Sequence, residues 1–457
     1  MLAAMKINAK LQHRTLIVGL GKTGLSCARY LARQGVPVAI TDSRLQPPEL
    51  NALREEFPDI AMFVGGFDAA AFAAAEEIIV SPGVSVQEPL VAAAIARGVP
   101  VIGDIELFAR VVTKPVVAIT GSNGKSTVTQ LVGDMVAAAE RHVAVGGNIG
   151  TPALDLLGQG AVDFYVLELS SFQLETTHSL NVAAAVCLNV TPDHLDRYHG
   201  MDEYRAAKLR IFRGDGVIIV NRDDALTNMY APPKRDVRSY GLDAPTGNNF
   251  GLRKSEGVDN SGGVEWLAQG AKLLMPVSDV LIAGRHNTSN ALAALCLGDA
   301  IGLPMDAMLM VLRRFPGLPH RTQFVAERDN IRWYNDSKGT NVGATQAALE
   351  GMPGKVVLIA GGLGKGQDFS VLRAAVAAKA RAVCLIGKDA SLIEQALTGV
   401  CPLVRCKDMR EAVQQARLAA QSGDVVLLSP ACSSFDMFTG YDHRGQVFTD
   451  EVLRTLH

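Results

Sequence analysis

The sequence lacks paired cysteines and long apolar runs. Its seven cysteines are scattered, and none stands in a Cys-x-x-Cys pair, so zinc sites and a disulfide framework are both poorly supported. No apolar run reaches the roughly 18 residues that a membrane helix needs. Residues 1–14 contain no apolar segment of the kind found in signal peptides. We therefore expect a reduced, cytoplasmic protein that does not insert into a membrane.

A strong charge of either sign is also missing. The formal net charge is −2, which argues against nucleic acid as a partner. Apolar residues make up 48% of the chain, which is enough to form buried cores and argues against disorder. At 457 residues the chain is too long for one ordinary core. Two or three domains are expected.

A glycine-rich loop stands near the start of the chain. Residues 15–18 predict a strand, and the loop 19–24, Gly-Leu-Gly-Lys-Thr-Gly, follows at once. A helix is expected over about 25–34, then a second strand over 36–40 that leads to Asp42. This Gly-x-Gly-x-x-Gly pattern with a later acidic residue is typical of a dinucleotide-binding Rossmann half. NAD is the obvious ligand, but another nucleotide could occupy the same crevice, because the fold fixes the location of the site rather than its chemistry.

A second glycine-rich loop occupies residues 120–127, Thr-Gly-Ser-Asn-Gly-Lys-Ser-Thr. It lies between a β-branched apolar run at 116–119 and a stretch of helix formers at 128–139. Strand, loop and helix in this order form a phosphate cradle, because backbone N–H groups converge at the helix N-terminus, where the dipole favours an anion. The alternative is a glycine-rich turn that binds nothing.

The side chains of this loop favour the phosphate cradle. Lys125 is expected to reach the outer phosphates of a nucleotide, and the hydroxyl of Ser126 or Thr127 to hold Mg²⁺. The loop is a compressed variant of the usual pattern, because Ile119 stands where that pattern has glycine.

Polar side chains follow two later predicted strands. Glu168 follows a strand at 164–167, and a carboxylate beside a phosphate loop can hold Mg²⁺ directly or through water. Residues 189–197 follow a strand at 182–188 and resemble a site, although a solvated loop is the alternative. Three further elements are expected: a helix at 206–212, short antiparallel strands over 232–270, and a helix preceded and capped by polar residues of 283–290.

Alternation of strands and helices resumes in a third block from about residue 317. Strands are predicted at 356–360, 382–386 and 425–428, which indicates another mostly parallel sheet. Residues 336–341 are too polar for a strand and are expected to form a loop. Arg321, Lys338 and Lys365 lie in three separate loops. Three cations so placed suggest anion binding, although a single loop lysine is usually only solvated surface.

The order of these motifs resembles the Mur ligase family of peptidoglycan synthesis over nearly the whole chain. The motifs shared with sister ligases and folylpolyglutamate synthases are 121–127, Glu168, 193–196, Lys208, 286–287 and 320–321. The motifs that resemble the D-glutamate-adding members are 19–26, 81–83, 336–338 and 429–434. The resemblance implies three α/β domains: a Rossmann-like UDP-sugar-binding domain (1–103), a central P-loop ATPase domain with a mostly parallel sheet (104–317), and a Rossmann-like amino-acid-binding domain (318–457).

The resemblance also implies a reaction, the ATP-dependent joining of D-glutamate to UDP-N-acetylmuramoyl-L-alanine. A substrate carboxylate would become an acyl phosphate, the amine of D-glutamate would attack it, and a tetrahedral intermediate would lose phosphate to leave an amide. Two anions must approach each other in the first step, so metal and lysine charges must dominate catalysis. The implied cofactors are ATP and Mg²⁺, the implied partners are these small molecules, and a monomer is expected.

Roles carry over from the family position by position. The implied catalytic residues are Lys125, Glu168, His194 and Lys208. The implied metal-site residues are Ser126, Glu168, His194 and Lys208, the last matching a lysine that is carbamylated in the family. The implied ATP-binding residues are Gly121, Ser122, Asn123, Gly124, Lys125, Ser126, Thr127, Asn287, Asn290, Arg321 and Asp336. The implied UDP-sugar-binding residues are Thr23, Asp42, Ser43, Arg44, Ser81 and Asn148. The implied D-glutamate-binding residues are Lys338, Lys365, Ser434 and Tyr441, the last standing where a phenylalanine is expected.

Simpler explanations exist for single residues and for the whole chain. Lys208 could be an exposed ion-pair partner, His194 could cap a helix, and Asp42 could pair with a ribose whichever nucleotide is bound. Another Mur-type or folylpolyglutamate-type ligase is the nearest alternative function. An NAD-dependent oxidoreductase would leave the phosphate loop and the third block unexplained, and a non-catalytic nucleotide-binding regulator would have little use for the four catalytic residues.

Overall fold

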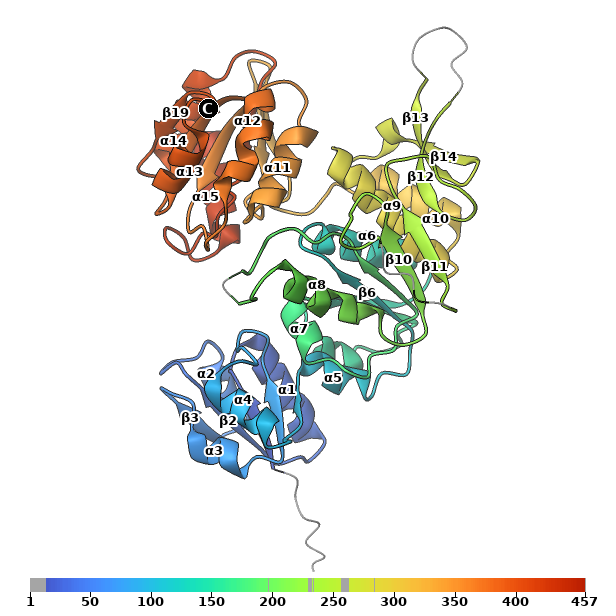
Figure 1. The fold of residues 1–457 in the computed structure, drawn as a ribbon, viewed down its shortest axis with the longest axis vertical. Helices are drawn as coiled ribbons and strands as arrows, with labels where there is room; N and C mark the ends of the chain where they lie inside the picture. The colour runs from blue at the N-terminus through green and yellow to red at the C-terminus, as the bar shows by residue number, and fades with distance from the viewer. Residues whose placement is uncertain are drawn as a thin grey trace, which may run out of the picture. The chain divides into compact units, whose positions relative to one another are not determined.

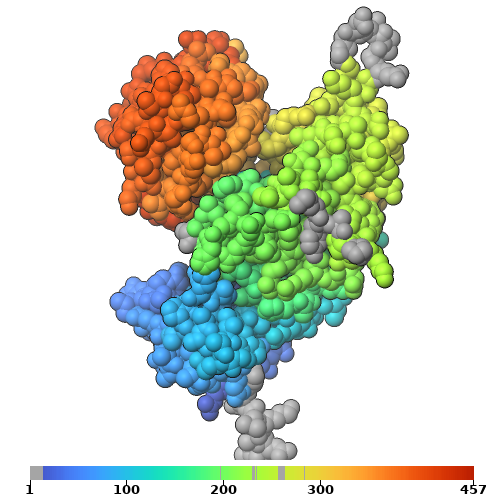
Figure 2. Space-filling view, in the orientation of Figure 1, coloured from blue at the N-terminus to red at the C-terminus, as the bar shows by residue number. Residues whose placement is uncertain are grey.

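The computed structural model describes residues 14–195, 197–228, 232, 234–255, 263–282 and 284–456, which are coloured in Figures 1 and 2. Its contacts divide the chain into two compact units. The first unit is Met1–Thr120, Arg141–Ala185 and Ala206–Gly216, and the second is Gly121–Glu140, Val186–Arg205 and Val217–His457. Within the described ranges no helix has the length and apolar content of a membrane span. Asp196 and nearly all of the segment 1–14 lie outside these ranges.

The first unit contains a five-stranded parallel sheet in the order β3-β2-β1-β4-β5 (Figure 1). Its strands are β1 (Thr15–Val18), β2 (Val38–Asp42), β3 (Ala61–Val64), β4 (Glu77–Val80) and β5 (Val101–Ile102). Its helices are α1 (Lys22–Arg33), α2 (Leu50–Glu56), α3 (Ala69–Ala74), α4 (Pro89–Ala96) and α5 (Asp104–Ala109). The strand order reverses between β1 and β4, so their carboxyl ends flank a crevice of the kind that binds ligands.

Strands β1 and β4 are buried on both faces of this sheet, and alternate residues pack on each face. Leu16 and Val18 of β1 and Ile78 and Val80 of β4 are buried in one core cluster, together with residues of α3 and α4. Helix α1 begins at Lys22, three residues before its expected start, because the extended backbone of Gly21 already provides the N-cap position.

A second sheet has nine strands in the order β14-β13-β12-β11-β10-β9-β6-β8-β7. They are β6 (Val116–Thr120), β7 (Val143–Gly147), β8 (Phe164–Glu168), β9 (Ala184–Cys187), β10 (Val217–Asn221), β11 (Val237–Tyr240), β12 (Phe250–Lys254), β13 (Glu265–Gln269) and β14 (Lys272–Pro276). The accompanying helices are α6 (Lys125–Ala138), η1 (Ala153–Gly158), α7 (Ser171–Glu175), α8 (Met201–Leu209), η2 (Arg210–Phe212), η3 (Val277–Asp279), α9 (Arg285–Ala300) and α10 (Met305–Arg314).

Two expectations for this region are wrong. Among the described residues of 217–276, strands β10, β11 and β12 pair in parallel, whereas β12, β13 and β14 pair antiparallel. The segment 222–236 is long enough for the crossover that a parallel return requires. Helix α9 begins at Arg285 without a side-chain cap, because its N-cap residue, Gly284, has no side chain. The helix expected at 206–212 is present, but it begins earlier, at Met201, and ends in the 3₁₀ turn η2.

A third sheet, within the second unit, has six strands in the order β15-β16-β20-β17-β18-β19. They are β15 (Gln323–Arg328), β16 (Ile331–Asn335), β17 (Val356–Gly361), β18 (Ala380–Ile386), β19 (Leu403–Arg405) and β20 (Val425–Leu428), and only β15 pairs antiparallel. The helices are α11 (Val342–Gly351), η4 (Phe369–Leu372), α12 (Arg373–Lys379), α13 (Ala390–Leu397), α14 (Met409–Ala419) and α15 (Tyr441–Leu456).

Helices cover both faces of the third sheet. Val356 and Leu358 of β17 share a core cluster with residues of α11, α12 and α13, whereas Val357 and Ile359 share another with residues of α14 and α15. Burial on both faces explains why these strands are continuous apolar runs. The three mostly parallel α/β sheets confirm the predicted fold class, while the domain boundaries expected near residues 103 and 317 stay a prediction.

Candidate active site

The first unit holds a cavity of about 520 Å³ at the carboxyl edge of its five-stranded sheet. The residues assigned to the UDP-sugar all line it: Thr23, Asp42, Ser43, Arg44, Ser81 and Asn148. The hydroxyl of Ser81 donates to the carbonyl of Gly19 at 2.8 Å, which joins the loops after β1 and β4. Gly19 has φ +94°, and a Cβ there would lie 3.0 Å from the Cβ of Ser81. Glycine is therefore required for the close approach of these two loops.

Asp42 is buried at the end of β2, beside this cavity. Its carboxylate accepts hydrogen bonds from the Leu20 amide at 2.7 Å and from Arg44 Nε and Nη2 at 2.9 and 2.7 Å. Burial by itself would raise the pKa of Asp42, but the hydrogen bonds from Arg44 and Leu20 bring this pKa below its ordinary value. A carboxylate ionised at neutral pH therefore stands where a Rossmann half presents an acidic residue to its nucleotide.

The cavity wall continues to Glu168 through Asn148. Asn148 Nδ2 donates to Glu168 Oε1 at 2.7 Å, and Glu168 is buried at the end of β8. In the parallel pair of β6 and β8, Glu168 lies opposite Ile119, which comes two residues before Gly121. Glu168 is thus linked to the cavity wall and to the strand that leads into the phosphate loop.

The phosphate loop connects β6 and α6, as predicted, with α6 beginning at Lys125. Gly124 adopts φ +84° at the N-cap of α6, and a Cβ there would collide with the side chain of Asn290. Lys125 Nζ donates to the carbonyls of Gly121 and Ser122 at 2.8 and 2.9 Å, so its side chain folds back over the loop. This geometry places an ammonium group over the loop at the N-terminus of α6, where the helix dipole favours an anion.

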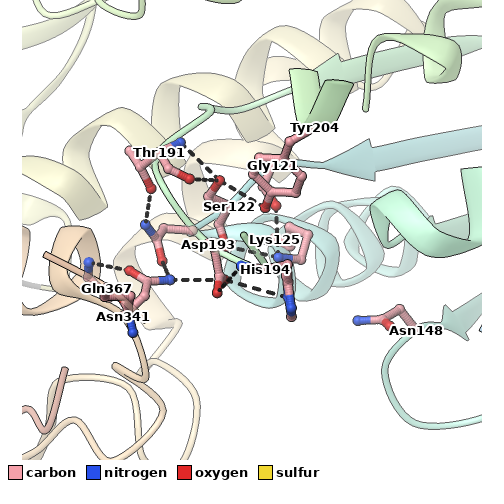
Figure 3. A network of polar contacts seen from close by, with 12 residues as sticks. Gly121, Ser122, Lys125, Asn148, Thr191, Asp193, His194, Tyr204, Asn341 and Gln367 are labelled. Carbon is pink, nitrogen blue, oxygen red and sulfur yellow. Dashed lines mark hydrogen bonds and ion pairs between the residues drawn. The ribbon is translucent and has the colours of Figure 1, made fainter. Parts of the chain in front are cut away.

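Residues that follow β9 hold the phosphate loop in shape (Figure 3). Ser122 Oγ accepts from the Thr191 amide at 3.0 Å and lies 3.2 Å from Tyr204 Oη. The Asn123 amide donates to Asn189 Oδ1 at 2.8 Å. Asn189 and Thr191 are therefore hydrogen-bonded to the phosphate loop, and the assignment of this run to a site stays a prediction.

His194 lies in the same run, in a left-handed conformation with φ +56°. Its Nε2 is 3.6 Å from Asp193 Oδ2, which also accepts from Asn341 Nδ2 at 3.3 Å. Helix α8 begins only at Met201, so the alternative in which His194 caps a helix is wrong. Left-handed conformations like that of His194 are uncommon in non-glycine residues and cluster at functional positions.

Lys208 lies on α8 in the first unit and is only 2% exposed. The alternative in which it is an exposed ion-pair partner is therefore wrong. Among the described residues, no three histidine, cysteine, aspartate or glutamate side chains gather as a metal site. The residues assigned to metal include a serine and this lysine, and their role stays a prediction.

A second cavity, of about 260 Å³, lies wholly within the second unit. Most residues assigned to ATP line it: Asn123, Gly124, Thr127, Asn287, Asn290, Arg321 and Asp336. Arg321 Nη2 donates to Ser126 Oγ at 2.7 Å, a bond from the start of the third block to the phosphate loop. Asp336 Oδ2 accepts from Ser429 Oγ at 2.7 Å, and burial raises the pKa of Asp336 to about 6.

His286 also lines this cavity, although no role was assigned to it in the sequence. Burial lowers its pKa to about 4, so the imidazole is neutral at physiological pH. Its Nδ1 atom has no hydrogen-bond partner among the described residues. A neutral ring suits the wall of a pocket for a flat, weakly polar group.

The residues assigned to D-glutamate follow three neighbouring strands of the third sheet. Lys338, Lys365 and Ser434 come after β16, β17 and β20, whose carboxyl ends share one edge of the sheet. Lys338 Nζ lies 3.6 Å from the centre of the Tyr441 ring, a cation–π contact that tyrosine makes as well as phenylalanine would. Two cations and a hydroxyl at one edge suit a ligand with two carboxylates.

Arg444 supports this edge, and sequence reasoning missed it. Its guanidinium is buried and donates to Ser337 Oγ at 3.0 Å, to the Ser337 carbonyl at 2.8 Å and to the Cys432 carbonyl at 3.0 Å. These bonds hold the loops that carry Lys338 and Ser434. No local sequence pattern could reveal a bond between residues 337 and 444.

The geometry defines a class of protein: an α/β enzyme with a Rossmann-like nucleotide cavity, a phosphate loop and an anion-binding edge on a further Rossmann-like sheet. The comparisons agree. The chain matches family models described as Mur ligase MurD-like, N-terminal domain (residues 13–103), Mur ligase middle domain (119–298) and Mur ligase, glutamate ligase domain (320–432). The chain belongs to the Mur ligase family, as its motifs predict.

Individual relatives extend the similarity over the whole chain. UDP-N-acetylmuramoylalanine–D-glutamate ligase of Nitrosococcus oceani is 53% identical over 444 residues, covering 97% of each chain. The enzyme of the same name from Pseudomonas aeruginosa is 52% identical over 444 residues, covering 96% of this chain and 98% of the relative. The crystal structure of UDP-N-acetylmuramate–alanine ligase from Thermotoga maritima shares the fold, with a TM-score of 0.60, 19% identity and coverage of 97% and 99%.

Proposed function

We propose that the chain catalyses the ATP-dependent addition of D-glutamate to UDP-N-acetylmuramoyl-L-alanine in peptidoglycan precursor synthesis. The observation that carries the proposal is the identity of 53% and 52%, over nearly the whole chain, to relatives named for this reaction. The chemistry of the three sites agrees with it. A nucleotide cavity, a phosphate loop and an edge with two lysines suit a UDP-sugar, ATP and a dicarboxylic amino acid.

The residues divide the work of the reaction. Lys125, the loop amides and Arg321 bind the phosphates and offset the negative charge that builds up as a phosphoryl group approaches the substrate carboxylate. Lys338, Lys365 and Ser434 hold the carboxylates of D-glutamate and orient its amine toward the activated carbonyl. Exclusion of water from this place protects the acyl phosphate until the amine attacks.

Mg²⁺ completes the proposed site. Its ligands would come from Ser126, Glu168, His194 and Lys208, and the buried, Asn148-bound carboxylate of Glu168 is the kind of oxygen donor that Mg²⁺ prefers. Lys208 fits only if it is carbamylated, because a buried ammonium would repel a cation. Bound Mg²⁺ would supply positive charge between the two anionic reactants. We also propose a cytoplasmic monomer with domain boundaries near residues 103 and 317.

Phosphate release tests the proposed function. Release from ATP is expected only when both UDP-N-acetylmuramoyl-L-alanine and D-glutamate are present, and to stop when EDTA removes the divalent cation. L-glutamate, D- and L-alanine and diaminopimelate serve as the comparison panel. Turnover with another amino acid and none with D-glutamate would assign the chain to a different branch of the family.

The ligand of the first-unit cavity can be tested separately. We expect the full chain to bind UDP-N-acetylmuramoyl-L-alanine and to show no useful affinity for NAD, although the loop 19–24 has the NAD fingerprint. Calorimetric titration of the protein with each ligand measures this. Tight binding of NAD together with no heat from the UDP-sugar would contradict the assignment of this cavity.

Changes at the third sheet are expected to affect D-glutamate selectively. Lys338→Ala and Ser434→Ala should each raise KM for D-glutamate by about 10- to 100-fold, because each removes a hydrogen bond to a carboxylate. The KM for the UDP-sugar should stay within about twofold. Lys388→Ala is the matched control, since this exposed lysine follows the neighbouring strand β18. Unchanged D-glutamate kinetics with weaker UDP-sugar binding would contradict the assignment.

A further inference from the structure

Asp104 is a buried carboxyl group that none of the proposed roles uses. It is the first residue of α5 and is 2% exposed. Its Oδ2 accepts from Gln173 Nε2 at 3.0 Å, and its buried Oδ1 has no hydrogen-bond partner among the described residues. A buried carboxylate with an unpartnered oxygen costs stability. The stability of the fold therefore does not explain why an aspartate occupies position 104.

Its partner Gln173 is held at both ends of the side-chain amide. Gln173 Oε1 accepts from the Ser170 amide at 3.1 Å, as part of the capping box that begins α7. Gln173 Nε2 donates to Asp104. Because a carboxylate can only accept hydrogen bonds, an ionised Asp104 excludes the flipped orientation of this amide.

Gln173 also lines the first-unit cavity, together with Asn148 and the residues assigned to the UDP-sugar. An amide nitrogen carries two hydrogens, and the bond to Asp104 uses one of them. The other is left for a ligand in the cavity. A close contact between Gly103 and Thr176 keeps Asp104 and Gln173 together. The Gly103 amide donates to the Thr176 carbonyl at 3.2 Å, and any Cβ on Gly103 would collide with the Thr176 hydroxyl.

We propose that Asp104 is a positioning residue for the UDP-sugar substrate. Through its hydrogen bond it fixes the Gln173 amide so that an N–H group faces the cavity and donates to an oxygen of the substrate. The inference rests on the proposed function, since it takes the cavity to bind the UDP-sugar. Asp104 thus influences the affinity of the protein for the UDP-sugar without contacting this substrate.

The electrostatic surroundings give the positioning a pH dependence. Burial raises the pKa of Asp104 to about 6, against the opposing effect of the hydrogen bond from Gln173. The elements packed against α5 carry three further titratable groups: Cys27 on α1, Asp155 on η1 and Glu175 on α7. Neither lysine nor arginine is among the causes of the pKa shift of Asp104. Below about pH 6 the carboxyl group becomes protonated and accepts less strongly from Gln173. The KM for the UDP-sugar should therefore rise as the pH falls from 7.5 to 5.5.

Steady-state kinetics of the full chain tests this. Asp104→Ala should raise KM for UDP-N-acetylmuramoyl-L-alanine by about 3- to 10-fold at pH 7.5 and change kcat and the KM for D-glutamate by less than about twofold, because it removes one orienting hydrogen bond. Asp104→Asn keeps an acceptor without a charge. It should show a smaller rise in KM, none of the wild-type pH dependence, and a higher melting temperature at pH 7.5. Asp59→Asn, at an exposed position in the same unit, is the control.

The outcomes separate this inference from the proposed function. Wild type that makes no product from the UDP-sugar overturns the proposed function. If the wild-type protein ligates, either of two results overturns the positioning role of Asp104. One is a wild-type KM for the UDP-sugar in Asp104→Ala, and the other is an unaltered pH profile of this KM in Asp104→Asn. If Asp104→Ala does not fold, the pH profile of Asp104→Asn decides alone.

Discussion

Lys125→Ala is expected to lower kcat for ligation by about 10²- to 10³-fold, the effect of removing one preorganised group that stabilises transition-state charge. Lys125 Nζ lies within hydrogen-bond distance of two carbonyls of the phosphate loop, at 2.8 and 2.9 Å. The ammonium is therefore held where phosphate charge develops. Phosphate release at saturating substrates measures the loss.

The control for this change lies at the other end of the same strand. Lys114 is exposed and comes two residues before β6, whereas Lys125 follows the loop at its carboxyl end. Lys114→Ala should keep kcat within about twofold. Thermal unfolding should place both variants within about 1 kcal/mol of wild type, since the bonds of Lys125 to the loop are local. Full activity in Lys125→Ala would contradict the phosphate-binding role of the loop.

Lys208→Ala is expected to lower kcat by about 10³-fold, because the proposed carbamate provides an oxygen ligand for Mg²⁺. The variant should remain folded. The lysine is 2% exposed, so its charge is not dispersed by water. Carbamylation converts it from a cation into a carboxylate-like group, which a metal site requires. Small carboxylates added to Lys208→Ala should restore part of the activity.

A second measurement identifies the modification itself. Electron density for the Mg²⁺-bound protein should show three additional atoms, one carbon and two oxygens, on Lys208 Nζ. Depletion of CO₂ should lower wild-type activity, and Lys114→Ala should respond as wild type does. An unmodified Lys208 beside bound metal would contradict the proposal.

Local patterns in the sequence predicted the parts of the site that are continuous along the chain. The phosphate loop 120–127 is recognisable because a β-branched strand, two glycines and Lys-Ser-Thr are adjacent residues. In the first-unit cavity, the loop 19–24 and Asp42 were predicted from a strand-loop pattern, since parallel strands bring such loops to one edge of a sheet, whereas Ser43, Arg44, Ser81 and Asn148 were implied by the family resemblance. The boundaries of α1 and α8 were less accurate, because capping and tertiary packing decide where a helix begins.

The amino-acid sequence by itself determined the alternating strands and helices of the first and third blocks, the two glycine-rich loops and the lysines of the third block. These features depend on the period of apolar residues and on the turn chemistry of neighbours, which are local properties. Only the tertiary structure decided that Lys208 is buried, that β10, β11 and β12 pair in parallel, and that Asp104 meets Gln173. Those outcomes depend on contacts between residues far apart in the chain, such as the 69 positions between Asp104 and Gln173. Packing selects such contacts, and no local pattern encodes them.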